Sequence, residues 1–198
     1  MKKPNCNLGS FGVYSGTRIP GARTNWRKPV MAHQTHGERG NETAPAAHKS
    51  ELTTLDGVIT ALYESVSFPP GRQPDYGRLR TLFHPDARIV PPRTEKGSGL
   101  EVLDLDSFIT SSAEHVVTSG LERLGFHERE VARRTSAFGT MVHLFSTYES
   151  RHTVNDPAPF QRGINSIQLV KDAHRFWVLS ILWEAEGPGN PIPRAFLI

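Results

Sequence analysis

The stretch GINSIQLVKDAHRFWVLSILWE, residues 163–184, decides the fold, because it reads as two strands that pair as a hairpin. Both runs are rich in Ile, Leu, Val, Phe and Trp, the side chains that favour strands. Each run carries apolar side chains on both of its faces, and an apolar area of that size does not face water. One face is therefore expected to line a core and a pocket, and the other a dimer interface.

Alternation along the strands divides the side chains of this hairpin into two sets. If the two strands pair with an even offset, one face of the hairpin carries Asn165, Ile167 and Leu169 from the first strand and Phe176, Val178, Ser180, Leu182 and Glu184 from the second. The opposite set is Ser166, Gln168 and Val170 with Trp177, Leu179, Ile181 and Trp183. The sequence leaves open which of the two sets faces the pocket.

Three helices are expected before this hairpin. Apolar residues at helical spacing predict a first helix over 52–66, with Ser50 as its N-cap, and a second over 75–83. A third helix is expected to begin after Asp104 or Asp106, because either side chain is suited to an N-cap.

Strands dominate the second half of the chain. The segment HPDARIV, 84–90, turns the second helix into a strand, and beyond Phe126 the apolar period changes from 3.6 to 2. Four strands are predicted there, over 128–139, 140–154, 161–171 and 175–186. Helices followed by an antiparallel meander indicate an α+β fold with the helices on one face of a sheet.

Charge is divided unevenly along the 198 residues. Residues 1–50 hold 8 Lys and Arg against 2 Asp and Glu, or +6, whereas residues 51–198 hold 15 against 18, or −3. The basic part lacks helical or strand periodicity, so we expect a disordered basic tail over 1–50 without specific nucleic-acid binding. A polar segment follows Met31, which favours Met31 as the start of translation and residues 1–30 as untranslated.

The sequence predicts a cytoplasmic protein. No apolar run approaches the roughly 20 residues that a membrane span needs, and the first residues are too polar for a signal peptide. Cys6 is the single cysteine, so no internal disulfide is expected.

The order of elements, with the stretches LFHPDARIV, FSTYESR, GINSIQL and RFWVLSILWE, resembles the nuclear transport factor 2-like superfamily, and more closely its bacterial SnoaL-like proteins. The resemblance covers residues 51–187 as one domain and leaves 188–198 as a C-terminal arm. It implies a cone-shaped, curved antiparallel sheet wrapped round three N-terminal helices, which is the cystatin-like fold. It also implies a pocket between helices and sheet and a homodimer formed through the sheet.

Two functions are compatible with this resemblance. The first is the binding of a small apolar molecule without turnover, favoured because no acid/base pair stands out in the sequence. The second is a cofactor-independent isomerase, cyclase or dehydratase, which needs a carboxylate or imidazole in an apolar cavity and a donor for an oxyanion. Whether the protein is an enzyme stays open at this point, and neither function requires a cofactor.

Four residues are candidates for acid/base catalysis. His84 and Asp86 could form a base and its orienting partner, although HPD is also a good helix stop and turn. His115 lies beside the apolar stripe of the third helix, and His143 alternates with apolar strand residues. If both imidazoles line one cavity, they are candidates for proton transfer, and a satisfied boundary histidine is the alternative.

Ligand contacts are expected from the strands. Tyr148 could donate to an oxyanion, Arg162 or Arg133 could grip a carboxylate, and the hairpin contributes the remaining candidates. These are Asn165, Trp183 and Glu184. The charged strand EREVARR, 128–134, is interpreted otherwise as a solvated or interface strand with cross-strand ion pairs. No metal-ligand spacing or phosphate-binding loop is present, so no metal site is predicted.

Overall fold

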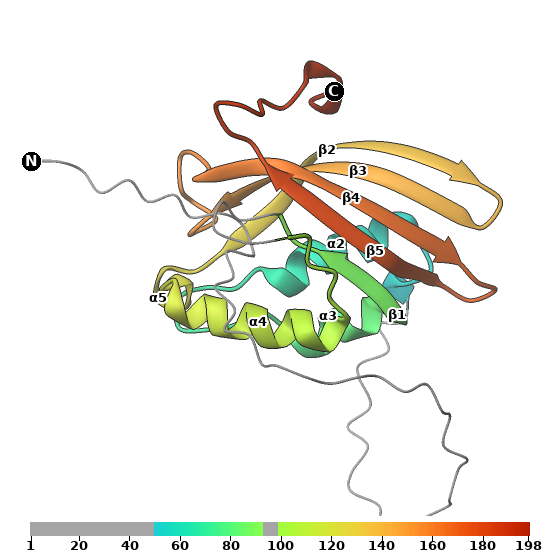
Figure 1. Cartoon of the computed structure of the whole chain (residues 1–198), viewed down its shortest axis with the longest axis horizontal. Helices are drawn as coiled ribbons and strands as arrows, with labels where there is room; N and C mark the ends of the chain where they lie inside the picture. Colours follow the sequence, from blue (N-terminus) through green and yellow to red (C-terminus); the bar gives the residue numbers. More distant parts are fainter. Residues whose placement is uncertain (1–49, 93–98) are drawn as a thin grey trace, which may run out of the picture.

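A five-stranded sheet with helices on one face forms the described part of the chain, residues 50–92 and 99–198 of this computed structural model (Figure 1). The strands lie in the order β1-β5-β4-β3-β2. Their bounds are β1 Phe83–Val90, β2 His127–Phe138, β3 Met141–Arg151, β4 Gln161–Lys171 and β5 Phe176–Ala185. The helices are α2 Leu55–Val66, α3 Tyr76–Leu82, α4 Leu105–Thr118 and α5 Leu121–Leu124, with a short 3₁₀ helix η1 at Arg194–Phe196. The predicted α+β class is confirmed.

Several sequence predictions fall on residues 1–49, which lie outside the described part. These are the disordered basic tail, the start at Met31 and the single Cys6. Among the residues that the structure describes, no helix is long and apolar enough to cross a membrane. The cytoplasmic location stays a prediction.

Short polar side chains begin the three longer helices. Thr54, Asp75 and Asp104 each accept a hydrogen bond, at 2.8–3.1 Å, from the backbone N–H three residues further on. Such bonds satisfy donors that have no partner within the helix. The N-cap expected at Ser50 is therefore corrected to Thr54, and of the two candidates for the third helix Asp104 is the cap.

The sheet is antiparallel except at one edge. Strands β2 to β5 form the predicted meander, whereas β1 pairs with β5 in parallel, with Phe83 beside Val178 and Ile89 beside Ile181. Hairpin turns impose the antiparallel direction within the meander. The chain between β1 and β2 instead contains α4 and α5, so no tight turn sets the direction of β1. We call the face that the helices cover the inner face, and the opposite one the outer face.

Strand β5 contains one residue more than its partner β4 over the same length. Gln168 pairs with Ser180, but the next residue, Leu169, pairs with Val178. Leu179 is therefore the extra residue of a β-bulge. A bulge of this kind interrupts the alternation of side chains between the two faces of a sheet.

Because of the bulge, the expected assignment of side chains to the two faces of the hairpin is wrong for the part of β5 beyond Leu179. Trp183 pairs with Asn165 and Ile181 with Ile167, so these four side chains share one face. Glu184 was expected beside Asn165 but lies exposed on the other side of the strand. The inner face thus combines the predicted first set of β4 with the second set of β5 beyond the bulge.

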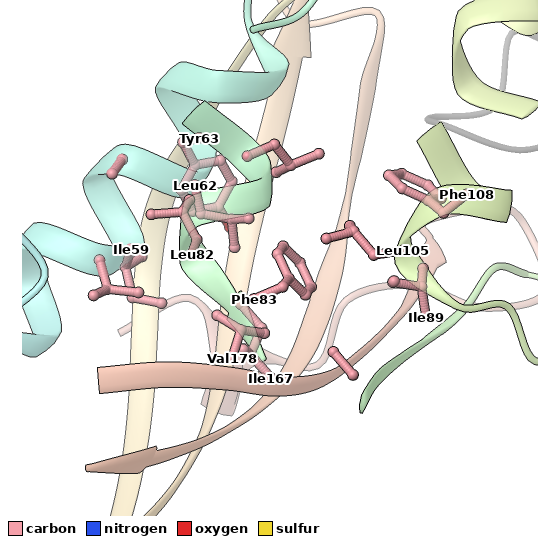
Figure 2. Close-up of a cluster of buried hydrophobic side chains, with 14 of the residues drawn as sticks. Ile59, Leu62, Tyr63, Leu82, Phe83, Ile89, Leu105, Phe108, Ile167 and Val178 are labelled. Carbon is pink, nitrogen blue, oxygen red and sulfur yellow. The ribbon is translucent and has the colours of Figure 1, made fainter. Parts of the chain in front are cut away.

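The core lies between the helices and the inner face of the sheet. Figure 2 shows its apolar side chains pointing toward one another from α2, α4 and the strands. The labelled members, all buried, are Ile59, Leu62, Tyr63, Leu82, Phe83, Ile89, Leu105, Phe108, Ile167 and Val178. Removal of this apolar area from water is the main stabilising contribution to the fold.

The C-terminal arm packs on the outer face, away from the helices (Figure 1). Thr147 of β3 donates a hydrogen bond of 2.5 Å to the carbonyl oxygen of Phe196. The Phe196 ring packs edge-on against Phe145, with 5.2 Å between ring centres, and the Arg134 guanidinium lies 5.4 Å from the same ring. A homodimer through the sheet stays a prediction, and it would have to use the outer face that this arm leaves uncovered.

We predict that Gly163→Ala destabilises the protein. A methyl group at Gly163 would overlap the carbonyl oxygen of Glu184 and the ring and hydroxyl of Tyr148, which lies over this glycine. Relief of such overlap requires strand movement, and we expect a loss of roughly 1–3 kcal/mol in the free energy of unfolding. Urea unfolding measures this loss. Gly99→Ala is the control, because no atom lies within 4 Å of the added methyl group. Equal unfolding midpoints for the two variants would contradict the close packing described.

Candidate functional site

A cavity of about 500 Å³, including its mouth, lies between the inner face of the sheet and the helices. Its apolar lining residues are Leu62, Val66, Leu79, Phe83, Phe108, Ile181 and Trp183. Its lining residues with polar groups are Tyr63, Glu128, Tyr148 and Asn165. A concave, mainly apolar space with a few polar groups is typical of small-molecule sites.

Three of the five predicted ligand residues line this cavity, namely Tyr148, Asn165 and Trp183. The other two do not. Arg162 lies 3.5 Å from the carboxylate of Glu186 in an ion pair, and Glu184 is exposed as a result of the bulge in β5. That the first three contact a ligand stays a prediction, whereas Arg162 and Glu184 are not placed to do so.

The predicted catalytic residues lie away from the cavity. His84 accepts a hydrogen bond of 3.1 Å from the backbone N–H of Asp86, and both side chains are exposed, as the alternative interpretation of HPD as a turn requires. His143 lies on the outer face, 3.0 Å from the Ser166 hydroxyl, so the expectation that it points inward is wrong. His115 is half-buried on α4, where burial lowers its pKa, but it does not line the cavity.

The carboxyl group that lines the cavity is that of Glu128 in β2, a strand predicted from the sequence to be solvated. The residue is half-buried, and its side chain borders the cavity. Ser150 donates a hydrogen bond of 3.0 Å to the Oε2 atom of Glu128. Burial raises the pKa of Glu128 to about 7, and hydrogen bonds from Ser150 and Asn165 partly oppose this effect. A carboxyl group in this range exchanges protons readily near neutral pH.

One signal in the sequence could have indicated Glu128. Strand β3 places Ser146, Tyr148 and Ser150 on alternate positions, so a row of polar groups faces the helices. Glu128 lies opposite Ser150 in the paired strand β2. This row can be recognised only when the register of the two strands is known. The many charged residues of EREVARR instead indicated a solvated strand.

A hydrogen-bonded cluster forms the polar wall of the cavity. The Asn165 side-chain amide donates to the Tyr63 hydroxyl at 3.1 Å, and the Tyr63 and Ser146 hydroxyls lie 2.6 Å apart. Burial, followed by the negative charge of Glu128, raises the pKa of Tyr63 well above its ordinary value. Tyr63 therefore keeps its proton and acts as a hydrogen-bond donor at all physiological pH values.

Arg133 is bound to other protein groups, which corrects its proposed use as a ligand clamp. Its Nε atom lies 2.9 and 3.0 Å from the two carboxylate oxygens of Glu130, and its Nη1 atom lies 2.5 Å from Asp56 of α2. A second β-bulge, at Val131, brings Glu130 and Arg133 to the same face, whereas simple alternation placed them on opposite faces. Simple alternation would have placed Arg134 on the face of Glu130, but the bulge turns it to the outer face.

Trp183 supplies a donor without a partner. Its side chain is 7% exposed and packs edge-on against Phe108, with 6.2 Å between ring centres. Its indole Nε1 atom is buried and has no hydrogen-bond partner among the described residues. An unsatisfied buried donor is costly, and a ligand acceptor in the cavity would satisfy it.

Comparison with known proteins supports the fold. No protein-family profile and no curated protein matches the sequence. A protein of unknown function with a cystatin-like fold from Nostoc punctiforme is 12% identical, with a TM-score of 0.50 over 69% of this chain and 96% of that one. A nuclear transport factor 2-like protein of unknown function from Silicibacter pomeroyi is 13% identical, with a TM-score of 0.45 over 67% and 92%. A protein from Parabacteroides distasonis, provisionally described as a ketosteroid isomerase, is 11% identical, with a TM-score of 0.47 over 70% and 97%.

The similarity to the Nostoc punctiforme protein shows the fold alone, because its identity is far below the level that indicates shared function. The cystatin-like fold that the resemblance implies is confirmed, whereas membership of the nuclear transport factor 2-like superfamily stays a prediction. The narrower SnoaL-like assignment stays a prediction.

We predict that Glu128→Gln changes how stability depends on pH. Because the pKa of Glu128 is about 7 when folded and 4.5 when unfolded, the unfolded chain loses its proton first as the pH rises. The wild type therefore loses stability between these values, relative to a variant without this carboxyl group. Between pH 5 and pH 8, we expect the free energy of unfolding of the wild type to fall by about 2 kcal/mol relative to that of Glu128→Gln.

Urea unfolding at several pH values measures this difference. Glu184→Gln is the matched control, because it makes the same substitution at an exposed carboxylate. If the free energies of unfolding of the wild type and of Glu128→Gln change equally with pH, the pKa of Glu128 is not raised.

Proposed function

We propose that the protein binds a small, mainly apolar molecule in this cavity and that Glu128 exchanges a proton with it. The observation that supports this proposal is a carboxyl group with a pKa of about 7 in the wall of an apolar cavity. The function proposed is cofactor-independent acid/base chemistry of the isomerase or lyase type. This is the second of the two functions drawn from the sequence. Glu128 is the acid/base group that could not be identified from the sequence alone.

The cavity wall favours proton transfer at Glu128. A general base works best when its pKa lies near the working pH, since it is then both ionised and a good proton acceptor. Burial supplies this pKa, and Ser150 and Asn165 hold the carboxyl group in place. Leu62, Val66 and their apolar neighbours exclude water, which strengthens the interaction of a ligand with the few polar groups.

Trp183 indicates which chemical group the ligand carries. Its unpartnered Nε1–H is suited to a carbonyl oxygen, on which negative charge develops when a neighbouring C–H proton is removed. In the proposed step the Glu128 carboxylate takes that proton, and the C–H electron pair moves to form the enolate, whose oxygen accepts from Trp183. Return of the proton to another carbon completes an isomerisation, and departure of a neighbouring hydroxide completes a dehydration.

Binding without turnover is the second candidate function. Glu128 already accepts from Ser150 and Asn165, so its carboxyl group also serves as a hydrogen-bonded link between β2, β3 and β4. A ligand could then be held by the apolar walls alone. The first experiment below separates the two functions, because it measures binding and proton exchange on the same probe.

We predict that the wild type accelerates exchange of the α-hydrogens of β-tetralone for deuterium in deuterated buffer. The ketone is mainly apolar and has acidic α-hydrogens next to a carbonyl group. Because the Glu128 carboxylate is the base, the exchange rate should rise as the pH passes about 7. Glu128→Gln should reduce the rate by about a hundredfold or more. Proton NMR follows the loss of the α-hydrogen signals.

Glu184→Gln serves as the control and should leave the exchange rate unchanged. Saturable binding of β-tetralone with equal exchange in wild type and Glu128→Gln would favour binding without turnover. Absence of both binding and exchange for a panel of such ketones would reject the proposal.

We predict that Trp183→Phe weakens the binding of benzaldehyde more than that of styrene. The two probes have similar shape, but only benzaldehyde carries an oxygen that can accept from the Trp183 Nε1–H. Loss of one such hydrogen bond should weaken benzaldehyde roughly three- to tenfold and styrene less than twofold. Trp177→Phe is the control, since the Trp177 indole donates to Asp172 at 2.8 Å. Equal losses for both probes would mean that Trp183 contributes only apolar contact. Calorimetric titration measures the affinities.

A further inference from the structure

A chain of hydrogen bonds runs from a half-buried ion pair to the cavity wall. It begins at Glu130 and Arg133, passes through the hydroxyls of Ser146 and Tyr63, and ends at the amide of Asn165. Its members come from β2, β3, α2 and β4, so it ties the polar side of the cavity together. We propose that Ser146 and Tyr63 are positioning residues, which transmit the orientation of the Glu130 carboxylate to the Asn165 amide in the cavity.

The direction of the chain is set at Glu130. Its carboxylate receives three hydrogen bonds or ion-pair contacts from Arg133, of 2.6, 2.9 and 3.0 Å. An ionised carboxylate only accepts hydrogen bonds, and a guanidinium only donates them. The Ser146 hydroxyl, which contacts the Oε1 atom of the same carboxylate, must therefore donate to it.

Each following hydroxyl has a single proton, so each step fixes the next. Ser146 uses its proton on Glu130 and can only accept from Tyr63, 2.6 Å away. Tyr63 then uses its proton on Ser146 and can only accept from Asn165, at 3.1 Å. The Asn165 side chain is 6% exposed and must present its NH₂ group, not its carbonyl oxygen, to Tyr63.

This orientation bears directly on Glu128. Asn165 and Glu128 both line the cavity, and the Asn165 side chain lowers the pKa of Glu128 as a hydrogen-bond donor does, which favours the ionised form. If the amide rotated by half a turn, its carbonyl oxygen would face a carboxylate and repel it. The chain from Glu130 thus keeps a donor, and not an acceptor, beside the proposed base.

The surroundings of Glu128 contain few groups that could imitate this effect. Among the described residues, the other titratable side chains that line the cavity are Tyr63 from α2 and Tyr148 from β3, and Glu130 lies on the same face of β2 as Glu128. Ser150 donates to it from β3 independently of the chain. A neutral change at Ser146 therefore alters the hydrogen-bond direction without altering any charge near Glu128.

The test is a carbon-13 NMR titration of the Glu128 carboxyl group in the full chain. In Ser146→Ala the Tyr63 proton is no longer held, so it can donate to the Asn165 carbonyl oxygen and turn the amide. Glu128 then loses the Asn165 donor, and we expect it to become a three- to tenfold weaker acid. Ser146→Thr keeps the hydroxyl and should restore the wild-type midpoint. Ser166→Ala is the matched control, because it removes a serine hydroxyl from the outer face of the sheet.

A folded Ser146→Ala protein with an unchanged or lower Glu128 midpoint would overturn the inference. Should Ser146→Ala fail to fold, Tyr63→Phe replaces it under the same criterion, since it removes the acceptor that holds Asn165 and keeps the buried ring. Only the catalytic meaning of this positioning rests on the proposed function. The titration needs neither ligand nor turnover, so an absence of proton exchange on β-tetralone and an absence of coupling to Ser146 are separate results.

Discussion

Side chains along a strand alternate strictly between the two faces of a sheet, and this constraint governs where every polar group of the protein lies. Within the meander of β2 to β5, the sheet departs from the alternation at two single residues, Val131 in β2 and Leu179 in β5. The first bulge turns Arg133 to the inner face, where it holds Glu130. The second turns Trp183 into the cavity opposite Asn165. The polar wall of the cavity and its orphan donor thus both depend on one extra residue in a strand.

A carboxyl group in an apolar wall lowers stability and raises reactivity for the same physical reason. Removal of water disfavours the charged form of Glu128, which weakens the fold at high pH and makes the carboxylate a stronger base. The hydrogen bonds from Ser150 and Asn165 moderate both effects without cancelling them. Proteins retain such groups where they serve a function, because an isosteric neutral side chain would fold more stably.

Much of the fold was predictable from the sequence, and the reason is local. Periods of 3.6 and 2, with Asp75 and Asp104 as caps, locate helices and strands without knowledge of their neighbours. The site was less predictable because it depends on register. Asn165 and Trp183 both line the cavity, but the sequence placed them on opposite faces, since nothing in RFWVLSILWE marks Leu179 as an extra residue. Glu128 was missed because a charged strand is usually solvated, and only the opposing Ser150 shows otherwise.

The parallel pairing of β1 with β5 also has a kinetic side. Phe83 lies beside Val178, so the cavity wall at this edge joins segments that are distant in the chain, whereas β2 to β5 are joined by consecutive hairpins. Contacts between distant segments form slowly, because a long loop must close first. We infer that the meander assembles first and that β1 closes the sheet last. In the native state the same edge would be the first to open, which amide hydrogen exchange in β1 and β3 would report.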